Sequence, residues 1–492
     1  MRGFPAYAWL KGYNKDLLIA DSIAAIIVTV MLIPQSLGYA MLAGVSPEVG
    51  LYASIIPLVA YALLGTSRTL SVGPVAVISL MTAVAVSDAV AQTGAGYHEA
   101  AIVLALLSGC VLVLMGFLKF GFLANFLSHP VVSGFISASG ILIALSQLKH
   151  LLGISAHGDT LPSLVHSLSQ GMHAFNLPTL AIGSFALLLL IGCRRHLVRS
   201  LITVGLSESA ATTLSKAAPV LAILLTIVAT VMFDLESLGV AIVGEVPRGL
   251  PKLALPSIEW PLVQTLLPAA ILISVIGYVE SISVGRTLGA KRRQRVDPNQ
   301  ELVGLGAANL ASAFSSGFPV TGGFSRSVVN FDAGAQTGAA SILTALGIAL
   351  AALFLTPILY FLPKATLGAT IIVAVMSLVD LGLIKKAWNY SRRDAFALLG
   401  TLIGTLLLGV EAGVIIGVAL SVILHLYHTS KPHTAIVGEV PGTEHFRNVD
   451  RHDVITDPNI CSIRIDESLY FPNASYLEDL VYGAIAKNPE IK

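Results

Sequence analysis

Two ionisable residues, Glu280 and Arg326, lie deep inside strongly apolar stretches of the sequence. Placing a charged side chain at the centre of a bilayer costs about 2.5 kcal/mol or more. Such residues either face a cavity and act on a ligand or an ion, or form a structural ion pair with each other. The functional alternative is favoured here, because each residue lies beside a break in the apolar pattern.

The two breaks are Gly/Pro-rich stretches, Ser71-Val72-Gly73-Pro74 and Pro319-Val320-Thr321-Gly322-Gly323. Each precedes a short apolar segment and therefore predicts a helix that begins within the apolar core. A helix start carries about half a positive charge and free N–H groups that bind anions. Arg326, in the first turn of the second short helix, adds a full charge and a fork of donors suited to oxyanions. The sequence therefore predicts an anion site between the two helix starts.

Neighbouring residues are candidate ligands. Gly73, Gly322 and Gly323 would let an anion approach the backbone closely, although glycines in such segments also serve tight helix packing. Gln35 and Tyr39 lie one turn apart on the first apolar segment. They either donate hydrogen bonds to the anion or bond to neighbouring helices, and the residues alone leave both roles open.

A count of charges assigns a role to Glu280. Two helix starts and Arg326 together supply about two positive charges. A divalent oxyanion is then neutralised only if Glu280 is protonated, whereas a monovalent anion leaves room for ionised Glu280. Glu280 is therefore the predicted coupling residue.

No enzyme signature is present in the sequence: the P-loop, His-Glu-x-x-His and Gly-x-Ser-x-Gly patterns are all absent. We therefore expect no enzymatic activity, no cofactor and no ATP-driven transport within this chain. Cys110, Cys193 and Cys461 are far apart, so no metal site is expected. A net charge of +1 gives no support for a nucleic-acid partner.

The elements that position these residues are membrane spans. The chain has 492 residues, of which 55% are hydrophobic and only 12% charged, about half the charged share of a soluble domain. Such a chain has too little polar surface for water, so a lipid bilayer is its expected solvent. Apolar segments long enough to enter a bilayer cover roughly residues 17–42, 49–65, 73–88, 99–118, 122–147, 178–193, 218–233, 262–284, 301–315, 324–332, 337–356, 365–381, 394–410 and 412–428.

Loop charges and internal similarity organise these fourteen spans. With both termini inside, the inner loops hold most of the Lys and Arg, whereas few lie outside, which fits the positive-inside bias. Residues 33–36 align with 278–281, and residues 71–74 align with 321–324. Because seven spans per half is an odd number, the second half enters from the opposite side, which predicts an inverted repeat with its site near the midplane.

The expected domain boundaries follow from composition. Residues 1–431 form the transport domain, with repeats at about 12–233 and 262–430, and residues 432–492 form a polar C-terminal segment. In that segment the pattern predicts a strand at 461–465, a short strand at 469–473 and an amphipathic helix at 476–487.

Several residue groups resemble signatures of the sulfate permease (SulP) family of anion transporters, and they follow in order within residues 10–430. They are Pro34-Gln-Ser-Leu-Gly-Tyr-Ala-Met-Leu-Ala-Gly44 with Gly50-Leu-Tyr52, Gly65-Thr-Ser-Arg68 with Ser71-Val-Gly-Pro-Val-Ala-Val77, Asn299-Gln-Glu-Leu-Val-Gly304, and Pro319-Val-Thr-Gly-Gly-Phe-Ser-Arg-Ser-Val-Val-Asn330. Residues 461–487 resemble the opening of the family's cytoplasmic STAS domain, so a partial α/β STAS segment is expected at 432–492.

The resemblance implies an all-α polytopic membrane protein of the uracil-permease-like type. Its fourteen transmembrane segments form a 7+7 inverted repeat, a core domain moves against a gate domain, and two copies form a homodimer. The matching positions place the anion near Gln35, Tyr39, Val72, Gly73, Pro74, Val75, Phe324, Ser325 and Arg326.

The resemblance also bears on coupling. Glu280 matches an acidic position linked to a coupling cation. Sodium-coupled bicarbonate relatives pair an Asp there with a Thr one turn on, whereas this chain has Val284, which lacks the hydroxyl ligand and favours a proton.

These observations predict a secondary active transporter of sulfate or a similar small oxyanion, working as a proton-coupled symporter by alternating access. The alternatives are a sodium-coupled bicarbonate transporter and an anion exchanger or channel, and dicarboxylate carriers share the scaffold. The expected location is the cell membrane, with several spans and both termini cytoplasmic.

Overall fold

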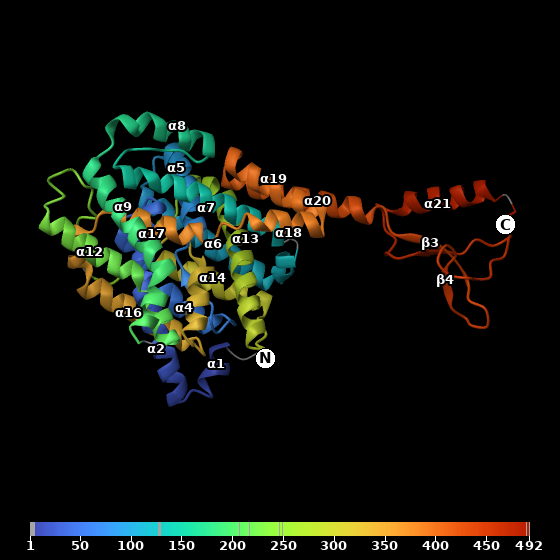
Figure 1. Ribbon diagram of the computed structural model, residues 1–492, viewed down its shortest axis with the longest axis horizontal. Coiled ribbons are helices and arrows are strands. Elements are labelled where there is room, and N and C mark those ends of the chain that lie inside the picture. Colours follow the sequence, from blue (N-terminus) through green and yellow to red (C-terminus); the bar gives the residue numbers. More distant parts are fainter. Residues whose placement is uncertain are drawn as a thin grey trace.

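The computed structural model describes residues 5–125, 129–205, 207–215, 217–245, 247, 249–488 and 490–491. A large helical body carries a small tail, and α20 (Val410–Thr429) leads from one to the other (Figure 1).

The helical body is built from two successions of seven segments. The first consists of α2 (Lys15–Leu42), α3 (Pro47–Tyr52) with α4 (Ile56–Leu64), β1 (Val72–Gly73) with α5 (Ala76–Thr93), α6 (Tyr97–Phe117), α7 (His129–Leu152), α9 (Leu177–Gly192) and α12 (Ala218–Met232). The second consists of α13 (Trp260–Lys291), α14 (Pro298–Phe314), β2 (Thr321–Gly322) with α15 (Phe324–Asp332), α16 (Ala339–Phe354), α17 (Lys364–Met376), α19 (Arg392–Leu408) and α20.

Short elements connect these segments. They are α1 (Pro5–Leu10), a 3-10 turn η1 (Phe120–Asn125), α8 (Leu161–Gly171), η2 (Met172–Ala174), a π-helical turn η3 (Cys193–Leu197), α10 (Val198–Thr203), α11 (Glu208–Ser215), η4 (Thr356–Phe361) and α18 (Gly382–Tyr390).

Eight helical stretches among the described residues are long and apolar enough to cross a membrane. The remaining segments are shorter. The helices that follow β1 and β2, α5 and α15, begin at the predicted breaks, and α5 is one of the eight. Every predicted span overlaps a helix of the fold, so the expected architecture of seven plus seven segments is confirmed. The span predicted at residues 122–147 differs at its start. Its first residues form η1, residues 126–128 lie outside the described part, and α7 starts at His129, next to Pro130.

The segments pack into two groups. The first contains α2, α4, α5, α6, α13, α14, α15 and α16, and it is the core domain. The second contains α7, α9, α12, α17, α19 and α20, and it is the gate domain. The groups meet where α17 and α12 pack on α2 and where α7 packs on α5.

The two breaks pair with each other at the centre of the core domain. β1 and β2 run antiparallel, with Val72 opposite Gly322 and Gly73 opposite Thr321. Equivalent segments of an inverted repeat must run in opposite directions, so this pairing is the arrangement that the repeat requires. The helices α5 and α15 leave the crossing from its two ends.

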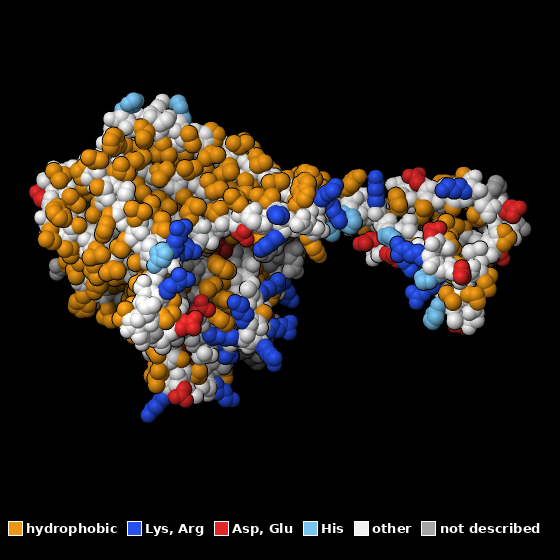
Figure 2. Space-filling model, in the orientation of Figure 1, with side chains coloured by type: hydrophobic (Ala, Val, Ile, Leu, Met, Phe, Trp, Pro, Cys, Tyr) orange, Lys and Arg blue, Asp and Glu red, His pale blue; other side chains and the backbone are white. Residues whose placement is uncertain are grey.

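The surface agrees with a membrane location. Hydrophobic side chains cover most of the helical body in Figure 2, whereas Lys and Arg gather toward the side that carries the N-terminus and the tail.

The tail, residues 432–492, holds a three-stranded sheet and one helix. β3 (Thr434–Glu439) lies between β4 (Phe446–Asn448) and β5 (Ile463–Ile465), and α21 (Ala474–Lys487) follows. The strand predicted at 461–465 and the helix predicted at 476–487 are confirmed, whereas β3 and β4 were not predicted.

The short strand predicted at residues 469–473 is wrong, because this segment is a turn. The side chain of Asn473 closes the turn: its Oδ1 accepts the Tyr470 N–H (2.9 Å), and its Nδ2 donates to the Ser468 carbonyl (3.0 Å). Pro472 also removes a donor that a sheet would need.

Candidate anion-binding site

The strand crossing is held by side chains from two neighbouring core helices. On α13, Ser281 Oγ accepts the Gly322 N–H (2.8 Å) and hydrogen-bonds Thr321 Oγ1 (2.8 Å). On α14, the Asn309 amide accepts the Val320 N–H (2.9 Å) and donates to the Val320 carbonyl (2.8 Å). The backbone of β2 is thereby fixed before α15 begins.

Both helices at the crossing begin without a side-chain cap. The residues that precede their first turns are Val75 for α5 and Gly323 for α15, and neither residue caps its helix through a side chain. The first-turn N–H groups of a helix have no acceptor within the helix. Two helix starts with their partial positive charges therefore meet at the centre of the core domain.

Arg326 lies between these helix starts and is 2% exposed. Its Nη2 donates a long hydrogen bond to the Thr321 carbonyl (3.4 Å). Its Nη1 has no hydrogen-bond partner among the described residues. A buried donor without a partner is costly, so the guanidinium is suited to bind an anion.

Two of the predicted ligand glycines make room for the arginine. A Cβ on Gly73 would lie 2.6 Å from Arg326 Nη1, and a Cβ on Gly323 would lie 2.9 Å from Arg326 Nε. Gly322 instead accommodates the Leu70 side chain, at 2.8 Å. The glycines therefore set the position of the guanidinium, a role that the sequence did not distinguish from direct contact with a ligand.

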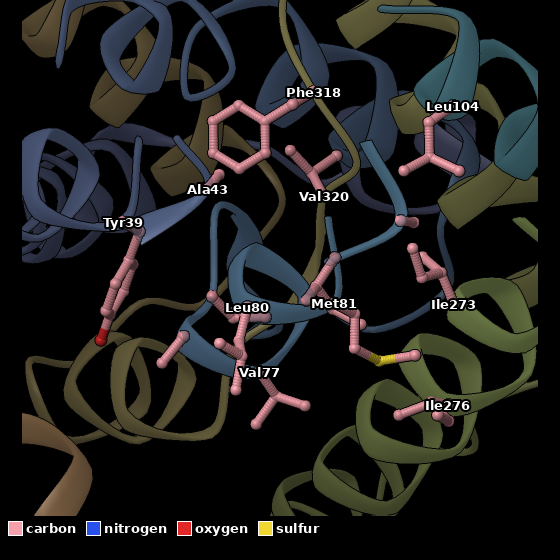
Figure 3. Close-up of a cluster of buried hydrophobic side chains, with 14 of the residues drawn as sticks. Tyr39, Ala43, Val77, Leu80, Met81, Leu104, Ile273, Ile276, Phe318 and Val320 are labelled. Carbon is pink, nitrogen blue, oxygen red and sulfur yellow. The ribbon is translucent and has the colours of Figure 1, made fainter. Parts of the chain in front are cut away.

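Tyr39 and Gln35 approach the crossing from α2. Tyr39 is buried in the main apolar cluster, which also contains Val72 and Val75, and in Figure 3 its hydroxyl lies at the edge of the group of apolar side chains. Tyr39 also lies within electrostatic reach of Arg326. The Gln35 side-chain oxygen is buried and lacks a hydrogen-bond partner among the described residues.

Glu280 lines a cavity of about 650 Å³ at the seam between the core and gate domains. The core contributes α13 and Phe324 of α15, and the gate contributes α7 and the residues that follow α17. Glu280 and Arg326 are within electrostatic reach of each other, yet no ion pair joins them in the part of the chain that the structure describes. The cavity therefore reaches both Glu280 and the start of α15.

The crossing brings together most of the predicted ligands. Val72, Gly73, Pro74 and Val75 form β1 and the approach to α5, and Phe324, Ser325 and Arg326 form the first turn of α15. Of these side chains, Phe324 is the most open at 48% exposure. Gln35, Tyr39 and Glu280 flank the crossing from α2 and α13.

Glu301 is a buried carboxylate that the sequence reasoning missed. It lies at the start of α14 and accepts hydrogen bonds from the Tyr61 hydroxyl (2.6 Å), the Thr66 N–H and hydroxyl (2.6 Å each) and the Ser67 N–H (3.0 Å). Glu301 thereby ties the loop before β1, in the first repeat, to α14 in the second repeat. The Asn299-Gln300-Glu301 motif could have indicated this role. Glu301 was missed because a carboxylate in the first turn of a span is expected at the membrane surface.

Two further charged residues anchor the second repeat. Asp21 on α2 is fully buried and accepts hydrogen bonds from the Gln336 N–H (2.6 Å) and from the Thr337 N–H (3.1 Å) and hydroxyl (2.6 Å). Arg292, at the end of α13, donates to the Phe331 carbonyl (2.9 Å) and to the Ala335 carbonyl. A cation at the C-terminal end of α15 stabilises that helix.

The chain is similar to proteins of a known family. The model of the sulfate permease family matches residues 18–401. Sulfate transporter 4.1, chloroplastic, of Arabidopsis thaliana is 38% identical over 97% of this chain and 68% of its own length. High affinity sulfate transporter 1 of Stylosanthes hamata is 30% identical over 97% of this chain and 72% of its own length.

Two solved structures share the fold. The murine Solute Carrier 26 family member A9 anion transporter, in the inward-facing state, matches with a TM-score of 0.87 and 24% identity, over 98% of this chain and 80% of that one. The transmembrane domain of the cyanobacterial bicarbonate transporter BicA matches with a TM-score of 0.68 and 20% identity, over 84% of this chain and 98% of that one. Because the family model matches most of the length of this multi-pass membrane chain, the chain belongs to the sulfate permease family.

Proposed function

We propose that the protein is a secondary active transporter of sulfate or a similar small oxyanion, coupled to protons and working by alternating access. The observation that carries the proposal is the buried Arg326, whose Nη1 has no hydrogen-bond partner among the described residues, between two uncapped helix starts. An oxyanion offers acceptors to that fork and to the N–H groups. Relatives that are named as sulfate transporters support this class of substrate.

Alternating access would move the core domain against the gate domain. β1, β2, α5 and α15 all belong to the core, so the site would travel as one unit. The cavity of about 650 Å³ that Glu280 lines between α13 and α7 would be its path to one side of the membrane. The gate would close that path when the core shifts.

Coupling to protons would place the titration at Glu280. Its protonation would balance a divalent anion against Arg326 and the two helix starts, which together supply about two positive charges. Val284, one turn on, is apolar and lines the same cavity. A sodium ion would find no hydroxyl ligand at that position, which favours the proton.

The remaining features of the proposal concern assembly and orientation. The transport domain would comprise residues 1–431 and a partial STAS segment residues 432–492. The protein would lie in the cell membrane as a homodimer, with both termini cytoplasmic, because the Lys and Arg of the helical body gather on the side that carries the tail.

Uptake into proteoliposomes tests the proposal. Labelled sulfate and labelled bicarbonate would be offered under an inward proton gradient, an inward sodium gradient or neither. We expect saturable sulfate accumulation that depends on the proton gradient alone. Sodium-dependent bicarbonate uptake would favour the sodium-coupled alternative, and a conductance without saturation would favour a channel.

A further inference from the structure

We propose that a groove between the start of α19 and the end of α20 binds the headgroup of an anionic phospholipid. This groove has a volume of about 710 Å³ and lies at the end of the gate domain next to the tail. Its residues are separate from the strand crossing and from the cavity that Glu280 lines.

Basic residues lie in the groove and on the segment next to it. Arg393 lines it from α19 and His425 lines it from α20, and Lys385, Lys386 and Arg392 are exposed on the adjoining α18–α19 segment. Asp394 also lines the groove and is the acidic member of the lining. Arg393 in the lining, together with Lys385, Lys386 and Arg392 on the adjoining segment, outnumbers Asp394, and such a surplus of cations suits a ligand with a phosphate.

The wall of the groove is apolar. Val422 and Leu426 of α20 line it and are 39% and 40% exposed. Ile423 on the same helix and Phe396 on α19 are also apolar and exposed, at 60% and 54%. An arginine and nearby basic residues beside an apolar wall match a phosphate attached to acyl chains, whereas a free phosphate would leave the wall uncovered.

The helix α18 has the features of an interfacial helix. Leu383, Ile384 and Ala387 pack its apolar side against Ala395 and Leu398 of α19. Its other side carries Lys385, Lys386, Trp388 and Tyr390, all exposed. The apolar side of α18 is thus covered by α19, and its exposed Trp and Tyr are of the type that lies at the membrane–water interface.

Trp388 provides a local reporter. Its ring packs on Phe396 with centroids 5.7 Å apart, on the turn of α19 that also carries Arg393. The chain has three Trp residues, so the variant Trp9→Phe/Trp260→Phe leaves Trp388 as the sole Trp. Lipids with brominated acyl chains quench a Trp that they contact, which makes occupancy beside Trp388 measurable.

The test reconstitutes the single-Trp protein into phosphatidylcholine vesicles that contain increasing fractions of dibrominated phosphatidylglycerol or dibrominated phosphatidylcholine. We expect quenching by the phosphatidylglycerol to indicate an affinity about tenfold higher than for phosphatidylcholine, because basic residues near a membrane surface attract anionic lipids additively. Lys386→Gln/Arg393→Gln should remove this preference. The control Arg195→Gln/Arg199→Gln, which neutralises two exposed arginines of the η3–α10 segment, should retain it.

Three results would overturn the proposal. The first is equal quenching by both lipids in the starting protein, and the second is an unchanged preference in Lys386→Gln/Arg393→Gln. The third is loss of the preference when inorganic phosphate saturates the groove, since a free anion would then be the ligand. Light scattering completes the test: if the double variant changes the oligomeric state while the lipid preference stays intact, the groove is a surface for a second copy of the chain.

Discussion

At the scale of single residues, Arg326 supplies both charge and geometry to the site. Its side chain is buried with Nη1 unpartnered among the described residues. We expect Arg326→Ala to weaken sulfate binding by about a hundredfold, because loss of one buried member of a charged pair costs about 3 kcal/mol. Binding of labelled sulfate to the purified protein measures this effect.

Two controls accompany this variant. Arg195→Ala removes an exposed arginine and should leave sulfate binding unchanged. Arg326→Lys keeps the charge without the planar fork and should restore only part of the affinity. Wild-type affinity in Arg326→Ala would mean that the anion binds elsewhere.

Glu280 is the residue that we propose to couple transport to the proton gradient. Glu280→Gln holds this position in a neutral form that resembles the protonated acid. We expect exchange of sulfate for sulfate to survive and proton-driven accumulation to fail. Both are measured in the same proteoliposomes, with a counterflow assay and with an imposed proton gradient. A variant that still concentrates sulfate against its gradient would exclude Glu280 as the coupling residue.

At the scale of elements, the antiparallel crossing of β1 and β2 allows two helices to start inside the core. The close approach of Arg326 to β1 depends on Gly73, where a Cβ would lie 2.6 Å from Arg326 Nη1. We expect Gly73→Ala to displace the guanidinium and to lower sulfate affinity at least tenfold, about 1.4 kcal/mol. Gly192→Ala is the matched control, since a Cβ there has no neighbour within 4 Å. Equal affinities for both variants would show that the arginine adapts without loss.

Glu301 joins elements from the two repeats. Its carboxylate accepts hydrogen bonds from Tyr61, Thr66 and Ser67. In Glu301→Gln an amide N–H₂ replaces one acceptor, leaving buried donors unsatisfied at a cost of about 2 kcal/mol. We expect lower thermal stability and a reduced maximal rate of sulfate uptake, while Glu259→Gln, at an exposed position, should change neither. A stable and fully active Glu301→Gln protein would contradict this positioning role.

The elements also indicate how far the sequence allows prediction. The apolar lengths, the two Gly/Pro breaks and the two charges beside them predict the spans, the inverted repeat and two helix starts with Arg326 in the first turn of the second. The pairing of β1 with β2 was not predicted. Glu301 and Asp21 were missed because their burial depends on partners more than 230 positions away, such as Thr66 and Thr337. Hydropathy places a carboxylate in the first turn of a span at the membrane surface, and only the packing of the repeats shows that it is buried.

In the tail, the missed elements are local. Its strands are short and weakly patterned, so a local reading predicted β5 and α21 but missed β3 and β4. The turn at residues 469–473 contains Leu, Tyr and Phe and has the composition of a strand. The hydrogen bonds of Asn473 decide its conformation, and they depend on geometry that composition does not express.

At the scale of the whole molecule, the tail and the candidate anion site belong to different parts of the chain. All candidate ligands lie before residue 331. Among the described residues, Tyr470 and Asn473 tie the tail to the end of α20: the Tyr470 hydroxyl hydrogen-bonds Thr429 Oγ1, and Asn473 Nδ2 donates to the Thr429 carbonyl (3.3 Å). The tail is thus coupled to the end of one gate helix.

Deletion of residues 432–492 should therefore lower expression or dimer stability more than it lowers substrate affinity. A segment of about 60 residues buries a modest share of its apolar surface and is marginally stable alone, so its contribution is expected under the membrane domain or across a dimer interface. The Michaelis constants for sulfate of the intact and shortened chains, reconstituted at matched amounts, measure the effect on the site. Tyr470→Phe, which removes only the hydroxyl contact with Thr429, is the control for a local disturbance of α20. A rise in KM of tenfold or more on deletion, about 1.4 kcal/mol, with Tyr470→Phe unchanged, would show that the tail shapes the anion site and that the functional boundary lies beyond residue 431.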